Sequence, residues 1–161
     1  MLNQEQQRFL NRFLSPFKQR LYYLRSLPMG LISGIRLIRI DENKSVTQVP
    51  FRWVNKNPFE SIYFAVLSMA AELSTAAPVI MALKGLEANV AFIIVGLKAD
   101  FSKKAKSRVI FTCEDYLAIN DAISQLSEPG DTASITAETI GRDVNGEEVA
   151  RFYFTWSFRV R

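Results

Sequence analysis

The 161-residue sequence contains no histidine and a single cysteine, Cys113. Without histidine, Ser-His-Asp and Cys-His catalytic arrangements and all histidine metal sites are excluded, and one thiol cannot complete a structural zinc site. Cys113 has no partner for an internal disulfide, which indicates a reducing compartment and a thiol that packs as a small apolar side chain. Any acid–base chemistry must therefore use carboxylates, lysine or tyrosine, and we expect no cofactor and no metal.

The sequence also lacks a long apolar run. No stretch approaches the roughly 20 apolar residues of a membrane-spanning helix, and the N-terminus has no secretory core followed by a small-residue cleavage site. With 48% hydrophobic residues, we expect one compact cytoplasmic domain. The net charge of +4 favours anionic partners in general. We expect no nucleic-acid partner, because the aromatic last strand lacks interleaved basic residues.

Residues 3–27 have the pattern of one amphipathic helix, which Pro16 should bend. The apolar side comprises Phe9, Leu10, Phe13, Leu14, Phe17, Leu21 and Leu24, and the basic residues are Arg8, Arg12, Lys18, Arg20 and Arg25. One interpretation is that this helix packs across the domain or a partner subunit. The other is a peripheral contact with an anionic membrane. We assign residues 1–33 to an N-terminal amphipathic helical extension and residues 34–161 to the main domain.

The strongest helix signal covers residues 57–77. Asn57 suits the N-cap, Pro58 the first helical position, and Glu60 can bond back to the cap as in a capping box. An apolar stripe, Ile62, Val66, Met69, Leu73 and Ala77, should pack against a sheet. Pro78 should end or kink the helix, with a short helical tail to Leu83. Glu72 lies on a second stripe of small and polar residues, and it is the one carboxylate after the first turn.

Apolar patterns predict strands over residues 35–40, 45–53, 90–101, 108–113, 131–142 and 148–160. Pro50 cannot donate to a ladder, so its strand should lie at a sheet edge or carry a bulge. The run from Val90 is almost continuously apolar, so its strand should be covered on both faces or buried in a dimer.

The connections carry further signals. Residues 102–106, SKKAK, form a basic turn that is either a solvated hairpin tip before the returning strand or a segment that steers a phosphate-bearing ligand. Residues 114–126 fit a helix or an irregular strand extension. Asn145 and Gly146 should supply the positive φ angles of a tight hairpin turn. A single long helix with a mostly antiparallel sheet predicts the α+β class.

This pattern resembles the hotdog-fold thioesterase superfamily, in which a curved antiparallel sheet wraps a central helix. The resemblance covers residues 34–161 and extends to a bacterial branch related to the phenylacetate-pathway acyl-CoA thioesterases. It rests on the N-x-N-P lead-in at Asn55 and Asn57, the run YFAVLSMAAEL (63–73), the segment KADFSKKA (98–105) and the D-x-N-G turn (143–146). It implies a hotdog fold with an added N-terminal helix, and a homodimer or dimer of dimers whose subunits share their sites.

In the related thioesterases a His-Gly-Gly triplet opens the helix, and an acidic residue follows seven positions after its last glycine. Here Tyr63, Phe64 and Ala65 occupy the triplet and Glu72 the acidic position. The resemblance implies that Glu72 acts as general base or nucleophile on an acyl-CoA or other acyl thioester, while an amide near the helix start polarises the carbonyl.

We treat Asn57 as a second catalytic candidate besides its capping role, and Tyr63, Phe64, Ala65 and Ser68 as candidate substrate-binding residues. An alternative follows from Phe64 and Ala65, which place side chains where the related enzymes have glycine. In a helix that starts at Asn57, their amides would already be hydrogen-bonded. The alternative is a catalytically weak or inactive hotdog module that binds an acyl chain or lipid.

Overall fold

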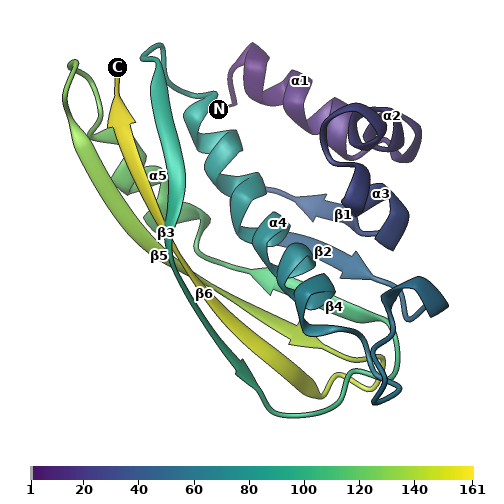
Figure 1. The fold of residues 1–161 in the computed structure, drawn as a ribbon. Helices are drawn as coiled ribbons and strands as arrows, with labels where there is room; N and C mark the ends of the chain where they lie inside the picture. Colours follow the sequence, from purple (N-terminus) through teal and green to yellow (C-terminus); the bar gives the residue numbers. More distant parts are fainter. Residues whose placement is uncertain (1) are drawn as a thin grey trace.

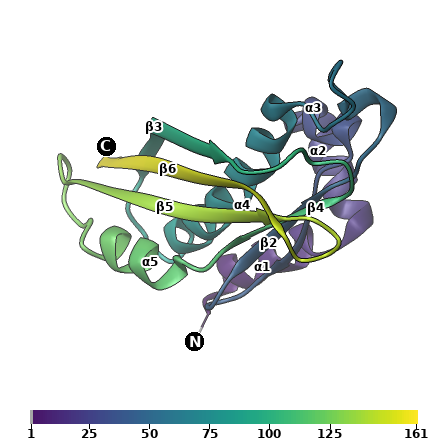
Figure 2. The same cartoon turned by 90° about the horizontal axis from the view of Figure 1, so that it is seen from below.

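The computed structural model describes residues 2–161. A six-stranded antiparallel sheet curves around one long helix, α4, and the other helices lie on the same side of the sheet (Figures 1 and 2). The elements are α1 (Gln4–Phe13), α2 (Pro16–Ser26), α3 (Pro28–Ser33), β1 (Arg36–Ile40), β2 (Ser45–Val49), η1 (Trp53–Asn55), α4 (Phe64–Leu83), β3 (Val90–Phe101), β4 (Val109–Cys113), α5 (Tyr116–Ser124), β5 (Thr132–Arg142) and β6 (Glu148–Val160). The α+β prediction is confirmed, with the curved sheet wrapped around the central helix.

The strand order is β1-β2-β4-β5-β6-β3, so β1 and β3 form the two edges. β3 pairs with β6, and β4 pairs with β2 and β5. The predicted hairpin between β3 and β4 is therefore wrong, and residues 102–108 cross between strands that are not neighbours. The pairing of β3 with β6 sets Phe92 opposite Phe158 and Leu97 opposite Phe154, which are contacts that local sequence patterns do not reveal.

The predicted strand over residues 45–53 is shorter in the structure. β2 ends at Val49, directly before Pro50, and it lies between β1 and β4, so the edge position predicted for it is wrong. Trp53 belongs to the 3-10 helix η1 and is 88% exposed. Proline thus ends this strand instead of marking an edge.

The C-terminal hairpin of β5 and β6 is confirmed, and α5 shows that residues 116–124 are helical. Gly146 has φ +80°, whereas Asn145 does not adopt a positive φ. The Asp143 carboxylate instead shapes the turn, because its Oδ1 accepts the backbone N–H of Asn145 at 2.9 Å and of Glu147 at 3.1 Å.

The N-terminal extension is three helices, which corrects the single bent helix of the sequence analysis. Pro16 and Pro28 each occupy the first turn of a new helix, where the missing N–H costs nothing. Gln6 Nε2 donates to the carbonyl of Met81 at 3.1 Å and so joins α1 to α4. Gln19 Nε2 donates to the carbonyl of Leu37 at 3.0 Å and joins α2 to β1. The extension is therefore packed on the domain.

The predicted apolar side of the extension divides between core and solvent. Phe9 and Phe13 are buried in the core. Phe17, Leu21 and Leu24 are 77%, 60% and 64% exposed. The second helix of the extension thus presents an apolar stripe outward.

The start of α4 differs from its prediction. The helix begins at Phe64 with Tyr63 as N-cap, so the capping box at Asn57 is wrong. Asn57 Oδ1 accepts the backbone N–H of Phe59 at 3.0 Å and of Ser61 at 3.2 Å, which closes a turn before the helix. Glu60 has φ +58°, a left-handed conformation that does not continue an α-helix.

The rest of α4 is the core helix. Pro78 lies inside it and does not end it, since the helix continues to Leu83. Small side chains bring it close to the sheet: Thr47 Oγ1 donates to the carbonyl of Ala70 at 2.6 Å, and the hydroxyls of Ser74 and Thr139 lie 2.7 Å apart. By length and composition α4 could span a membrane, contrary to our expectation of no such run, but 67% of that stretch is buried in the protein. That burial is typical of a core helix.

Cys113 lies at the end of β4 and is buried and unpaired, as predicted. Burial raises the pKa of its thiol to about 12, so the thiol stays protonated near neutral pH. Cys113 therefore acts as a core side chain.

Candidate functional site

The first turn of α4 presents unbonded backbone amides. Tyr63 N–H donates to the carbonyl of Asn55 at 2.8 Å, and Ile62 N–H donates to the carbonyl of Ala105 at 2.8 Å. Within residues 2–161, the N–H groups of Phe64 and Ala65 have no hydrogen-bond acceptor. These are orphan donors of a helix start, and they lie at the positive end of the helix dipole. The later start of α4 thus leaves available the amides that a helix starting at Asn57 would have bonded.

Asn55 holds this helix start in place. Its side chain is buried, and Nδ2 donates to the carbonyls of Ser33 at 2.9 Å and Pro50 at 2.8 Å. Together with the bond from the Tyr63 N–H to the Asn55 backbone carbonyl, these contacts tie α3, the end of β2 and the start of α4 to one residue. The sequence drew attention to Asn55 only as part of the N-x-N-P lead-in, and its buried bonding was not predicted.

A groove lies beside the helix start, and we call it the helix-start groove. Its volume is about 330 Å³, and it is lined by Asn57, Ser61, Ile62, Phe64, Leu67, Phe101, Ser102, Lys103, Lys104 and Ala105. It brings two predicted site residues, Asn57 and Phe64, together with the basic segment 102–106. Tyr63, Ala65, Ser68 and Glu72 are not among its lining residues.

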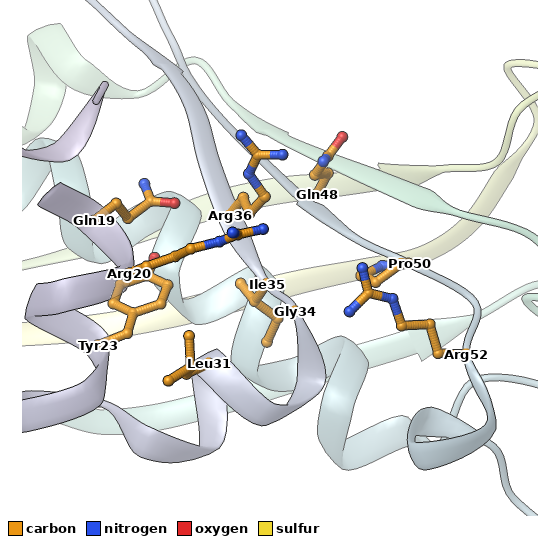
Figure 3. Close-up of a pocket in the computed structure, with 10 residues that line it drawn as sticks. All are labelled: Gln19, Arg20, Tyr23, Leu31, Gly34, Ile35, Arg36, Gln48, Pro50 and Arg52. Carbon is orange, nitrogen blue, oxygen red and sulfur yellow. The ribbon is translucent and has the colours of Figure 1, made fainter. Parts of the chain in front are cut away.

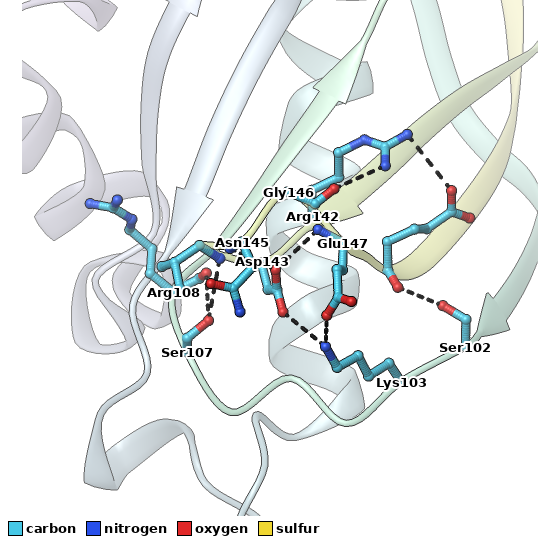
Figure 4. A network of polar contacts seen from close by, with 11 residues as sticks. Ser102, Lys103, Ser107, Arg108, Arg142, Asp143, Asn145, Gly146 and Glu147 are labelled. Atoms are coloured by element: carbon cyan, nitrogen blue, oxygen red, sulfur yellow. Dashed lines mark hydrogen bonds and ion pairs between the residues drawn. The ribbon is translucent and has the colours of Figure 1, made fainter.

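The basic segment is fixed to the β5–β6 turn (Figure 4). Lys103 Nζ forms ion pairs with Asp143, at 3.3 Å, and with Glu147. Ser102 Oγ donates to the carbonyl of Glu148 at 2.8 Å. Lys104 lies over the Phe59 ring at 5.7 Å from its centroid. These surface ion pairs offset the charge of Lys103, so this segment carries less free charge towards a ligand than its sequence suggested.

Glu72 lies about two helical turns after Ala65, on the same face of α4. The side chain is partly buried, and burial raises the pKa of its carboxyl from 4.5 to about 6. No hydrogen bond or ion pair reaches its carboxylate from the described part of the chain; only its backbone carbonyl is used, by Thr75 Oγ1 at 3.0 Å. An unpaired carboxylate with a raised pKa is suited to accepting a proton near neutral pH.

Ser68 and Thr75, which helical spacing places beside Glu72, are bonded within the fold. Ser68 Oγ donates to the carbonyl of Phe64 at 2.8 Å, so its hydrogen is used by the helix backbone. Thr75 Oγ1 accepts the indole N–H of Trp156 at 3.2 Å, which places that side of α4 against β6. Neither hydroxyl has a free hydrogen to offer, although Ser68 can still accept one from water.

The edge strand β3 leaves apolar surface uncovered. α4 packs chiefly on β2, β4 and β5, and it contacts the edge strand β3 much less. A bulge between Ile94 and Gly96 keeps Phe92, Leu97 and Phe101 on the inner face, where they are 41%, 56% and 51% exposed. The prediction that this strand is covered on both faces is therefore not met within one chain, and burial in a dimer stays a prediction.

The sequence matches no protein-family model and no curated protein. Its structure, however, is similar to many solved ones. A probable thioesterase of Pseudomonas aeruginosa is 20% identical with a TM-score of 0.72, over 93% of this chain and 99% of that chain. A putative thioesterase of Shewanella oneidensis is 12% identical with a TM-score of 0.72, over 96% of this chain and 99% of that chain. A thioesterase of Haemophilus influenzae is 14% identical with a TM-score of 0.63, over 87% of this chain and 88% of that chain. The resemblance to the hotdog thioesterase superfamily is thus confirmed at the level of the fold, and this chain is a hotdog-fold protein.

Proposed function

We propose that this protein is a homodimeric acyl thioesterase in which Glu72 activates water and the amides at the start of α4 stabilise the oxyanion. The observation that carries the proposal is that α4 holds both a carboxylate and backbone amides that have no hydrogen-bond partner in the described part of the chain. The Glu72 carboxylate has no partner within residues 2–161, and neither do the amides of Phe64 and Ala65. A thioester carbonyl needs both functions, a base for the attacking water and donors for the developing negative charge.

The spacing of these features supports a shared site. Glu72 is the seventh residue after Ala65, which corresponds to a rise of about 10 Å along the helix axis. A base and oxyanion donors that act on one carbonyl must each lie within about 3 Å of their target atoms, or reach them through one water. One protomer therefore has difficulty supplying both groups to the same thioester. Two antiparallel copies of α4 can do so, with the helix start of one copy facing Glu72 of the other.

The uncovered edge strand offers the surface for such a dimer. β3 is 12 residues long, and one side of its backbone has no strand partner in the described chain. A long apolar edge strand is a template for pairing with another strand. Antiparallel pairing of two β3 strands would join the sheets, cover Phe92, Leu97 and Phe101, and set the two α4 helices side by side in opposite directions. The same contact between subunits would thus cover the exposed apolar residues of the sheet and complete the active site.

The substrate class follows from the groove and the acid. The thioester would lie at the helix start, and the helix-start groove, with Phe64, Leu67 and Phe101 on its wall, offers apolar contacts to an acyl chain or carrier arm. Near neutral pH, a carboxyl with a pKa of about 6 is mostly ionised and still basic enough to take a proton from water. We infer an acyl-CoA or another acyl thioester as substrate.

A second candidate function rests on Phe64. Its side chain is 55% exposed and lines the groove at the point where the related enzymes have glycine. If this side chain occupies the place of the thioester, the protein binds an acyl chain or lipid without efficient hydrolysis. The predicted roles of Tyr63 and Ser68 in substrate binding belong to both candidates, whereas the predicted catalytic role of Asn57 belongs to the hydrolase alone.

The experiment is thiol release from short, long and aryl acyl-CoAs by the wild type, Glu72→Ala and Phe64→Gly. The hydrolase proposal expects turnover that Glu72→Ala reduces at least a hundredfold and that Phe64→Gly retains. An unchanged rate in Glu72→Ala would remove Glu72 from the mechanism. Absence of turnover in the wild type, with acyl-CoA binding and a gain of activity in Phe64→Gly, would support the binding module instead.

A further inference from the structure

A cavity lined by arginines lies between α2, β1 and the segment after β2 (Figure 3). Since β1 and β3 are the two edges of the sheet, the cavity lies at the edge opposite β3. Its volume is about 300 Å³. Arg20 from α2, Arg36 from β1 and Arg52 from the segment before η1 extend into the same space, and Gln48 adds an amide group to its wall. Gln19 also lines the cavity, but its Nε2 donates to the carbonyls of Phe13 and Leu37. The cavity thus collects hydrogen-bond donors from segments far apart in the sequence.

These arginines have no anionic partner in the protein. Within residues 2–161, the guanidinium groups of Arg20, Arg36 and Arg52 form no hydrogen bond and no ion pair, whereas Arg8, Arg39, Arg142 and Arg151 each pair with a carboxylate. Tyr23, which also lines the cavity, is 1% exposed, and its hydroxyl has no hydrogen-bond partner there. Three unpaired positive charges around one cavity repel one another, so a bound anion would stabilise the arrangement.

The backbone is shaped to admit one of these side chains. Gly34 has φ +70°, and a Cβ atom at this position would lie 2.8 Å from Nη1 of Arg52. A side chain here would therefore push the Arg52 guanidinium away from the cavity wall. The glycine both ends α3 and leaves room for the arginine.

The chemistry next to the cavity points to a lipid. Arg20 lies at the border of the exposed apolar stripe of α2, which comprises Phe17, Leu21 and Leu24, and Lys18 and Arg25 follow on its other side. Residues 1–40 hold seven lysines and arginines and one carboxylate, Glu5, so this segment supplies the positive excess of the whole chain. An apolar stripe flanked by basic side chains on a helix is the pattern of a segment that lies in the interface of an anionic membrane.

We propose that the arginine cavity binds the phosphate of an anionic lipid headgroup while Phe17, Leu21 and Leu24 enter the membrane interface. Guanidinium groups bind phosphate oxygens in a bidentate manner, and three of them from separate elements can surround one phosphate. The site is formed by the N-terminal extension and the β1 edge, at the edge of the sheet opposite β3. It does not depend on thioester hydrolysis.

The test is co-sedimentation of the full chain with phosphatidylcholine vesicles that either contain or lack phosphatidylglycerol. One variant replaces Arg20, Arg36 and Arg52 by glutamine. A matched control replaces Lys104, Lys106 and Arg108 by glutamine, which removes the same charge from the β3–β4 loop. Each basic side chain at an anionic surface contributes about fivefold in affinity, so the cavity variant should bind about a hundredfold more weakly. The control should change binding only a few-fold. A further variant, with Phe17, Leu21 and Leu24 changed to serine, should also bind weakly.

Three results would overturn the proposal. The first is wild-type protein that binds vesicles with and without phosphatidylglycerol equally. The second is an equal loss of binding in the cavity variant and the loop control, which would mean attraction by net charge alone. The third is calorimetric binding of free CoA or inorganic pyrophosphate that the cavity variant loses, with no vesicle binding by the wild type, which would assign the cavity to a soluble phosphate ligand. Circular dichroism of each variant establishes that it is folded.

Discussion

The raised pKa of Glu72 has a measurable effect on stability. The carboxyl has a pKa of about 6 in the folded protein because burial disfavours its charged form, against 4.5 when it is exposed. Between these two values the folded state binds more protons than the unfolded state. The free energy of unfolding should therefore fall as pH rises from 4.5 through 6 and then level off. The difference between the two pKa values lowers the free energy of unfolding by up to about 2 kcal/mol above pH 6.

Glu72→Gln removes the charge and keeps the shape of the side chain. At about pH 8 the variant should be more stable than the wild type by up to about 2 kcal/mol, and at about pH 4 the two should be nearly equal. Urea unfolding at one protein concentration measures both differences, since the stability of a dimer depends on concentration. A Gln variant that is less stable than the wild type at about pH 8 would refute the reasoning. It would show that the carboxylate forms a stabilising bond, within the fold or across a subunit interface, and is structural.

Three further outcomes follow from the fold. Replacing both Phe92 and Leu97 by lysine places charges on the inner face of the β3 edge. Light scattering should then show a monomer where the wild type is a dimer. A dimer in the variant would exclude this edge as the interface. Asp143→Ala removes the acceptor of two backbone N–H groups and an ion pair with Lys103. Thermal unfolding should therefore show a loss of about 1–3 kcal/mol in the free energy of unfolding. An unchanged melting temperature would contradict the role of Asp143 in the turn. Gly146→Ala, at φ +80°, should cost about 1–2 kcal/mol in the same measurement, whereas Val144→Ala, at an exposed position of the same turn, serves as the matched control and should cost less.

The positions that sequence reasoning located correctly are those set by local periodicity. The pattern along α4 sets Glu72 on a face that the structure leaves partly open, and the alternation in residues 131–160 defines the β5–β6 hairpin. In both cases the information lies within a few residues of the position in question. The single apolar helix among strands was sufficient for the α+β prediction.

The start of α4 shows why other positions were not predictable. An asparagine oxygen can cap a helix or close a turn with equal local chemistry, and Asn57 does the second. The choice is made by distant groups, since the carbonyls of Asn55 and Ala105 bind the amides of Tyr63 and Ile62. This late start leaves the amides of Phe64 and Ala65 without acceptors, which the sequence alone had assigned to a bonded helix interior.

The strand order was not predictable either, because it also depends on residues far apart in the sequence. β3 and β4 follow each other in the chain, as hairpin strands do, but the partner of β3 is the aromatic strand β6, far along the sequence. The arginine cavity has a similar origin: Arg20, Arg36 and Arg52 come from α2, β1 and the segment before η1, and only the tertiary fold brings them together.

The pH dependence of kcat/KM for one acyl-CoA substrate, measured for the wild type and Glu72→Gln, tests the central claim most directly. We expect the wild-type value to rise with pH through about 6, as the Glu72 carboxyl ionises, and then to level off. Glu72→Gln should lose at least a hundredfold in kcat/KM and should lack this rise. A Gln variant with the wild-type value and the same pH profile would contradict the assignment of Glu72 as the base.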